Sequence, residues 1–338
     1  MMRPMPGTDW RIVQPSQAEL RPAWRPVATL VFVTSMIAAV NWNWIEKTPL
    51  PKAQAGGAVA LMNGAMVIAG GTHWENDVKL WLRDVQVYDV RADQWRQGPL
   101  LPSALGYGPY TQSAAGLEIY GGSDGVTASR KIYTLDAGLQ GWKQTGEAPA
   151  VVLLGHAARV GPAVYLIGGC EDVADLTRCT DAVWKRVDGG KWEKVGSIPN
   201  GPVALGATAV VDGRIYLFGG CSMPGGKLRN HSEAWMFDPG RGTWKALRGL
   251  GAANRGLTAV AAGGRVFLFG GYTDGGFTAD VVAYDPVRDA YEAQPAMPLA
   301  TVGLQFVEAG GRIWGAGGEH KMKARSARAF TATLPLGR

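Results

Sequence analysis

The sequence lacks the motifs that mark the commonest catalytic sites. Its 338 residues contain no nucleophile elbow with a Ser-His-Asp set, no glycine-rich phosphate loop and no Cys-x-x-Cys zinc pair. Serine hydrolases, phosphate-loop nucleotidases and zinc-ribbon proteins therefore have no support in the sequence.

Strong charge of one sign is also missing. The chain has 34 Lys and Arg against 28 Asp and Glu, a net charge of +6. Basic residues cluster only near the C-terminus, at Lys321, Lys323, Arg325 and Arg328. Nucleic acid is therefore not expected as a partner, whereas a weak attraction to acidic ligands is compatible with this charge.

Glycine, by contrast, is abundant and regularly placed. Six double glycines, each closing a short apolar run, follow one another at spacings of 51, 47, 51, 51 and 47 residues. They are Gly70-Gly71, Gly121-Gly122, Gly168-Gly169, Gly219-Gly220, Gly270-Gly271 and Gly317-Gly318. The apolar runs, such as residues 164–167 and 266–269, are rich in β-branched and aromatic residues, which is typical of buried strands. A period near fifty with such strands predicts a radial all-β array.

Aromatic residues after each double glycine indicate a third and a fourth strand. The third carries an aromatic at Tyr88, Tyr133, Trp184, Phe237 or Tyr284. Seven to nine residues later the fourth carries Trp95, Trp142, Trp192, Trp244 or Tyr291. This order of apolar strand, Gly-Gly, Tyr and Trp resembles the kelch repeat over roughly residues 41–335. The resemblance implies a six-bladed kelch-type β-propeller.

The sixth repeat has no fourth-strand aromatic before the chain ends at Arg338. The N-terminal segment supplies one, because Trp44 precedes Pro51 by seven residues, as Trp95 precedes Pro102. We therefore expect residues 41–47 to complete the last blade and close the ring, so that 41–338 form one propeller domain. The alternative is that Trp42 and Trp44 belong to an interfacial membrane anchor.

An uncharged apolar run of 14 residues, 27–40, precedes the first blade. It follows four arginines and is short for a membrane-spanning helix, which needs about 20 residues. It resembles a signal peptide cut near Ala38 or Ala39. We expect residues 1–40 to be a signal peptide and the protein to be periplasmic or extracellular. Membrane attachment through residues 27–40, as a short anchor, is the alternative.

The three cysteines predict at most one disulfide. Cys170 ends the second strand of the third blade and Cys179 opens its third strand, so the two strands are paired neighbours. A disulfide between them is reasonable in an oxidising compartment and would leave Cys221 over. Three free thiols are the alternative.

One end of the propeller is expected to carry the functional site. In a blade, the loop entering the first strand and the loop joining the second to the third lie at the same end. The residues after each double glycine therefore meet those before each first strand, around the mouth of a concave channel. Three of the four histidines and several acidic residues fall there.

The last blade carries the most suggestive pair in this set. Gly318-Glu319 followed by Arg325 resembles the Gly-Glu…Arg element of bacterial kelch-type N-acetylneuraminate epimerases, the periplasmic sialic acid mutarotases. The resemblance implies that Glu319 takes the anomeric hydroxyl proton and that Arg325 binds the carboxylate of a small acidic sugar. We expect His320 as the catalytic partner of Glu319. Further substrate-binding residues are expected at Arg255, His73 and His156.

The same face is also compatible with a different class of function. A non-catalytic module would bind a protein or glycan partner there, with aromatic residues such as Trp74 and Tyr272 as anchors. No metal or cofactor is expected with either function. Glu171, Asp175 and Cys179 have the spacing of the iron site in plant nitrile-specifier kelch proteins, but that site has His in the third place.

Overall fold

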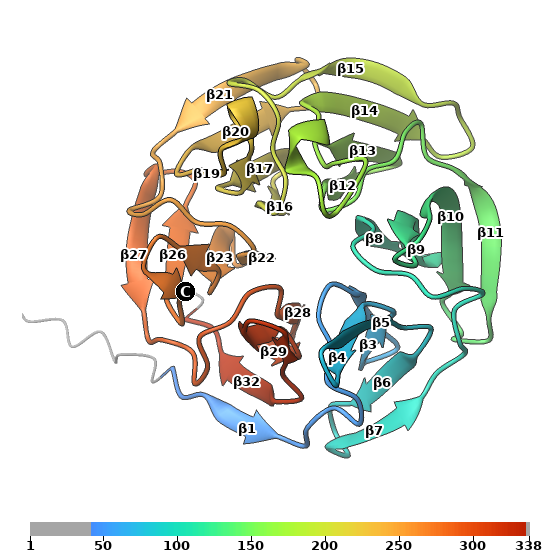
Figure 1. Cartoon of the computed structure of the whole chain (residues 1–338). Coiled ribbons are helices and arrows are strands. Elements are labelled where there is room, and N and C mark those ends of the chain that lie inside the picture. The colour runs from blue at the N-terminus through green and yellow to red at the C-terminus, as the bar shows by residue number, and fades with distance from the viewer. Residues whose placement is uncertain (1–41, 336–338) are drawn as a thin grey trace, which may run out of the picture. The chain divides into compact units, whose positions relative to one another are not determined.

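The computed structural model describes residues 42–335, which form six four-stranded antiparallel sheets around a central channel (Figure 1). Each sheet is one blade, so the predicted all-β, six-bladed propeller is confirmed. Blades one to three consist of β2 (Ala58–Met62), β3 (Ala65–Ala69), β6 (Val85–Asp89) and β7 (Gln94–Gln97); β8 (Tyr110–Ser113), β9 (Gly116–Ser123), β10 (Ala128–Asp136) and β11 (Trp142–Glu147); and β12 (His156–Val160), β13 (Ala163–Ile167), β14 (Ala182–Val187) and β15 (Glu193–Ser197). Blades four to six consist of β16 (Ala207–Val211), β17 (Arg214–Phe218), β20 (Ala234–Asp238) and β21 (Thr243–Leu247); β22 (Thr258–Ala262), β23 (Arg265–Phe269), β26 (Val281–Asp285) and β27 (Ala290–Gln294); and β28 (Gln305–Ala309), β29 (Arg312–Ala316), β32 (Ala329–Thr333) and β1 (Ile45–Lys47).

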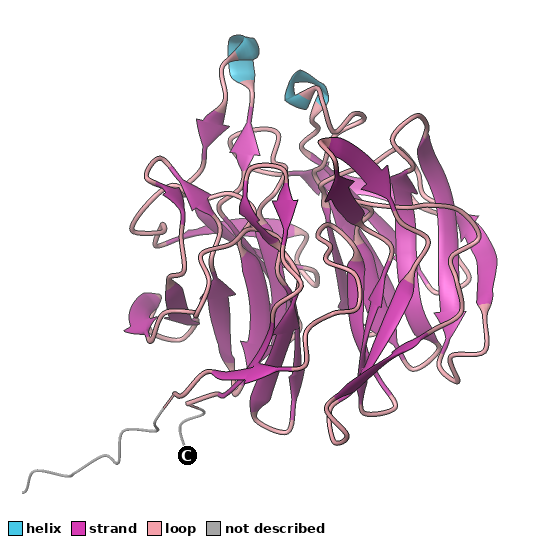
Figure 2. Cartoon of the chain, turned by 60° about the horizontal axis from the view of Figure 1, so that its bottom comes forward, coloured by secondary structure: helices cyan, strands magenta, loops and turns pink. Residues whose placement is uncertain are grey.

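Small extra elements lie at one end of the ring. In the chain they come between the second and third strands of a blade. Four blades carry a two-stranded ribbon there: β4 (Thr72–Glu75) with β5 (Val78–Trp81), β18 (Cys221–Ser222) with β19 (Arg229–Asn230), β24 (Tyr272–Thr273) with β25 (Gly276–Phe277), and β30 (Glu319–Lys321) with β31 (Ala324–Arg325). Two 3-10 helices, η1 (Leu176–Arg178) and η2 (Pro224–Gly226), lie at the tips of loops that rise from this end (Figure 2).

The double glycines join neighbouring blades through the backbone. Gly70 and Gly71 have φ of 68° and 94°, a region that residues with a side chain rarely adopt. A Cβ on Gly70 would lie 2.2 Å from the carbonyl oxygen of Leu105. The Gly71 N–H donates to that same carbonyl, in the loop that leads into blade two, at 2.8 Å. Glycine is therefore required where the backbone of one blade meets the next.

The N-terminal strand closes the ring as expected. β1 pairs antiparallel with β32, with Ile45 opposite Thr331. The Trp44 indole N–H donates to the carbonyl of Pro295 in the preceding blade, as Trp95 donates to Thr48. Trp42 is 5% exposed and its ring packs against Phe267 and Phe269. Both tryptophans therefore belong to the propeller and not to a membrane anchor.

The hydrophobic core lies in the seams between blades. Between the first two blades, for example, Val67, Val85, Leu117 and Ile119 pack together and are almost fully buried. Because each blade is packed on both sides, the six innermost strands are held rigidly around the channel. The framework of any channel site is thus set by apolar packing.

The cysteine pairing agrees with the sequence prediction. Cys170 and Cys179 form a disulfide, and Cys221 is a buried free thiol. No helix among residues 42–335 is long and apolar enough to cross a membrane. The predicted signal peptide or anchor at residues 1–40 lies outside the described residues.

Candidate functional site

The residues that follow the double glycines meet the residues that enter the first strands, as predicted. Backbone bridges pair Ala55 with Thr72, Arg255 with Tyr272, and Val302 with Glu319. The other three blades have the same bridge. We call the end of the propeller formed by these two sets of residues the double-glycine face.

A ring of backbone hydrogen bonds surrounds the channel on this side. Its members are Gly56, Tyr107, Leu154, Leu205, Gly256 and Gly303, each fourteen residues before a double glycine. From Tyr107 onwards each N–H donates to the carbonyl of the preceding member, at 2.6 to 2.9 Å. All six have a positive φ, although three of them carry side chains. The sequence offered no signal for this ring, because Tyr and Leu rarely adopt this conformation.

Glu319 and Arg325 form an ion pair, with the Arg325 side chain 3% and the Glu319 side chain 20% exposed. The other Arg325 donors point to protein groups as well. Nη2 donates to Thr72 Oγ1 at 2.8 Å and to Tyr107 Oη at 3.0 Å. The second oxygen of Glu319 accepts from the Lys323 backbone N–H at 3.1 Å. Arg325 therefore holds the Glu319 carboxylate at the rim of the channel, and its guanidinium is occupied by that task.

Lys79 lies over the ring of Tyr107, the residue to which Arg325 donates, a feature that the sequence did not reveal. Its ammonium is 4.6 Å from the ring centroid of Tyr107 and 4.9 Å from that of Trp81. In the described part of the chain it has no acidic partner within ion-pair distance. Tyr107 thus contacts both Arg325, through its hydroxyl, and Lys79, through its ring face. Lys79 and Trp81 are two residues apart in β5, so their side chains lie on the same side of the ribbon. This spacing is the sequence signal that could have identified them.

The other predicted residues on this face make no hydrogen bond with the ion pair in the described part of the chain. The His73 imidazole is hydrogen-bonded through Nδ1 to the carbonyl of Ala53 at 2.8 Å. His320 follows Glu319 in β30 and is exposed. Arg255 donates to Asn230 at 2.6 Å and lies 4.4 Å over the Tyr272 ring, at the ribbons of blades four and five. None of the three residues hydrogen-bonds to the Glu319 or Arg325 side chain within residues 42–335.

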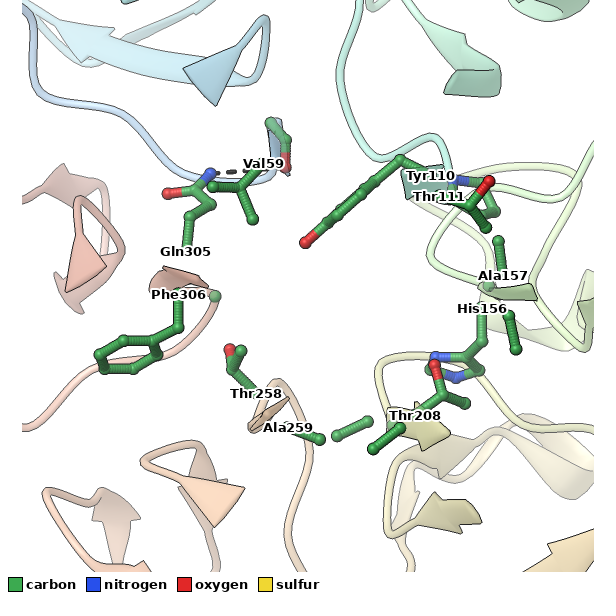
Figure 3. A pocket seen from close by; sticks show the side chains of 18 of the residues that line it. Val59, Tyr110, Thr111, His156, Ala157, Thr208, Thr258, Ala259, Gln305 and Phe306 are labelled. Atoms are coloured by element: carbon green, nitrogen blue, oxygen red, sulfur yellow. Dashed lines mark hydrogen bonds between the residues drawn. The ribbon is translucent and has the colours of Figure 1, made fainter. Parts of the chain in front are cut away.

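The channel itself holds a cavity of about 540 Å³, lined by the first strands of all six blades (Figure 3). Of the six predicted site residues only His156 lines this cavity. It is 7% exposed, and burial lowers the pKa of its imidazole to about 4. The predicted residues therefore divide between two places, the double-glycine face and the channel interior.

Comparison with known proteins identifies the repeat. A family model described as the KLHDC2/KLHL20/DRC7 Kelch-repeats domain matches residues 155–327, and a Kelch motif model matches residues 55–100. The chain is 28% identical over 219 residues to Kelch-like protein 38 of Homo sapiens, covering 62% of this chain and 35% of that protein. Kelch-like protein 35 of Mus musculus is 24% identical over 210 residues, covering 62% and 34%. N-acetylneuraminate epimerase of Yersinia pestis (strain Pestoides F) is 33% identical over 110 residues, covering 28% of each chain. The chain thus spans about a third of the length of the curated relatives it matches, or less.

Proposed function

This chain belongs to the kelch-repeat family, and from that premise we propose that it binds a small acidic sugar on its double-glycine face. The observation that carries the proposal is the position of the Lys79 ammonium over the ring of Tyr107, whose hydroxyl is hydrogen-bonded to the arginine that holds Glu319. Lys79 has no acidic partner among the described residues. The partial similarity to N-acetylneuraminate epimerase supports the same class of ligand.

We assign the reaction of this site to interconversion of sugar anomers. Lys79 binds the carboxylate of the sugar, the role that the sequence suggested for Arg325. Glu319 accepts the proton of the anomeric hydroxyl while the ring C–O bond breaks, and a donor protonates the ring oxygen. Reclosure on the other face of the carbonyl returns the protons and completes the exchange. Arg325 is a positioning residue for Glu319, and His320 stays the predicted proton donor.

Export is part of the proposal. The disulfide between Cys170 and Cys179 supports an oxidising compartment, in which such bonds persist. The apolar run at residues 27–40 is consistent with secretion. These two features support the proposal of a periplasmic or extracellular location.

The test is proton NMR of anomer equilibration, with freshly released α-N-acetylneuraminate as substrate. We expect the wild-type protein to accelerate equilibration and Glu319→Gln to abolish the acceleration. Lys79→Met should raise KM by about tenfold or more, because a charge-assisted hydrogen bond contributes roughly 1.5–3 kcal/mol. Lys321→Met, an exposed lysine of the neighbouring ribbon, is the matched control and should change little. No acceleration by folded wild-type protein would refute the reaction.

A second candidate function is favoured by the apolar side chains on this face. Five large hydrophobic residues of its ribbons and loops are exposed, by 36% to 95%: Val78, Leu80, Val126, Leu228 and Met322. Where such residues lie together, they mark a surface that docks a protein. If N-acetylneuraminate neither binds nor equilibrates faster, the double-glycine face is assigned to a protein partner instead.

A further inference from the structure

One buried histidine in the channel has no side-chain hydrogen-bond partner within residues 42–335. His156, in the innermost strand β12, is 7% exposed, and no described group hydrogen-bonds to its Nε2. Gly206 of the next blade lies against it, and a Cβ there would be 3.2 Å from Nε2. Since burial keeps the imidazole uncharged near pH 7, it can both donate and accept. A buried polar group without a partner is uncommon in proteins and calls for an explanation.

Two partly buried hydroxyl groups on the neighbouring blades also have no partner among residues 42–335. Tyr110 of β8 and Thr208 of β16 line the cavity beside His156 (Figure 3). Figure 3 shows the Tyr110 hydroxyl projecting into the open middle of the channel. Neither hydroxyl is hydrogen-bonded to a described residue, whereas Thr111 bonds to Tyr120 and Thr258 to the carbonyl of Leu304. Three consecutive blades therefore present one unpaired hydrogen-bonding group each.

The rest of the cavity wall carries apolar side chains and polar ones that are already hydrogen-bonded. Val59 and Ala259 line it from blades one and five, whereas the ring of Phe306 turns away from the channel and packs against Phe269 (Figure 3). The side-chain amide of Gln305 donates to the carbonyl of Ala316 and accepts from the Gly57 N–H. The unpaired polar groups therefore lie on one side of the cavity.

The cationic residue of the cavity lining, Arg159, is already paired, because it forms ion pairs with Glu118 and Asp188. The Glu308 carboxylate accepts a hydrogen bond from the Gly311 N–H at 2.7 Å. An anionic ligand would meet no free counter-charge here, and its desolvation would go uncompensated. An uncharged ligand fits the lining better than an anionic one.

We propose that the channel is a second binding site, separate from the double-glycine face, for an uncharged, hydroxyl-rich molecule of monosaccharide size. Its hydroxyl groups pair with the Tyr110 and Thr208 hydroxyls, next to the His156 imidazole, and its C–H face packs against Val59 and Ala259. The cavity of about 540 Å³ lies within the usual range for small-molecule sites, about 300–1,000 Å³. Pyranose and cyclitol rings have this combination of a hydroxyl edge and an apolar face.

The test uses the full-length protein with myo-inositol and D-glucose as probes, followed by saturation-transfer NMR and calorimetry at neutral pH. We expect at least one probe to bind, and Tyr110→Phe and Thr208→Val each to weaken it by about tenfold, the value of one hydrogen bond. Thr243→Val, at an exposed position of the outermost strand β21, is the matched control and should leave the affinity unchanged. The imidazole resonances of His156, identified by comparison with His156→Phe, should shift on addition of the probe.

Two outcomes would overturn the proposal. If neither probe binds, the unpaired groups are satisfied by ordered water only. If a probe binds but neither variant weakens it and the His156 signals do not move, it binds elsewhere. This test is independent of the mutarotation assay, because the probes are neutral and the N-acetylneuraminate substrate is acidic. The two proposals can therefore fail separately.

Discussion

Replacement of Glu118 by Gln should destabilise the propeller strongly. Glu118 lies in β9 and is 9% exposed. It forms ion pairs with two arginines of the next blade, Arg159 and Arg186, whose side chains are 15% and 13% exposed. Tyr120 also donates to its carboxylate, at 2.9 Å. Two largely buried guanidinium groups therefore share one carboxylate at the seam between blades two and three.

The expected magnitude follows from the partners that remain. In the Gln variant Arg159 keeps Asp188, whereas Arg186 is left without an acidic partner among the described residues. Removal of one partner from a buried ion pair typically costs about 3–5 kcal/mol. We expect about 3 kcal/mol, the lower end, because the amide oxygen of Gln still accepts a hydrogen bond. With about 2.1 cal/mol/K of unfolding entropy per residue over roughly 300 residues, that loss lowers Tm by about 5 °C.

The assay is thermal unfolding followed by circular dichroism, with Glu147→Gln as the matched control. Glu147 pairs with Arg130 in the same blade at 3.3 Å, but the two side chains are 57% and 48% exposed. An exposed ion pair contributes about 0–1 kcal/mol, so the control should lose less than about 2 °C. Equal Tm changes in the two variants would refute the reasoning, since they would show that Glu118 and its arginines are solvated.

Two further predictions concern His156 and the closing segment. The folded-state pKa of His156, about 4, lies below its unfolded value of about 6.5, so the unfolded chain binds the proton first as pH falls. His156 should therefore lower the free energy of unfolding by up to about 3 kcal/mol as the pH falls from about 6.5 to 4. In urea unfolding, the His156→Phe variant should lose less stability over that pH range than the wild type. Equal losses in the two proteins would contradict this. Trp42→Ala should lower the free energy of unfolding by about 3–5 kcal/mol, because a large buried ring is removed next to Phe267 and Phe269. Trp74→Ala, which changes a half-buried ring on a surface ribbon, is its control, and a Trp42 loss no larger than the control would mean that this segment does not hold the ring closed.

The sequence predicted the site less completely than the fold. It placed Glu319 and Arg325 together, and they are paired. It did not identify Lys79, because nothing in a single ribbon strand shows that the Tyr107 ring of another blade lies beneath its ammonium. It also grouped His156 with the residues of the double-glycine face, whereas the first residue of β12 turns its side chain into the channel.

By itself the sequence determined the number of blades, the strands in each and the closing role of Trp44, whereas it allowed the pairing of Cys170 with Cys179 without deciding it. These features depend on spacing along the chain and on local backbone requirements, such as the need for glycine where two blades meet. Both can be recognised within each repeat. Only the tertiary structure decided that Arg325 is occupied, that Lys79 is free of acidic partners in the described residues, and that Tyr110, His156 and Thr208 line one wall unpaired. Those facts depend on which side chains of different blades come within hydrogen-bonding distance, and that is set by the packing of the whole ring.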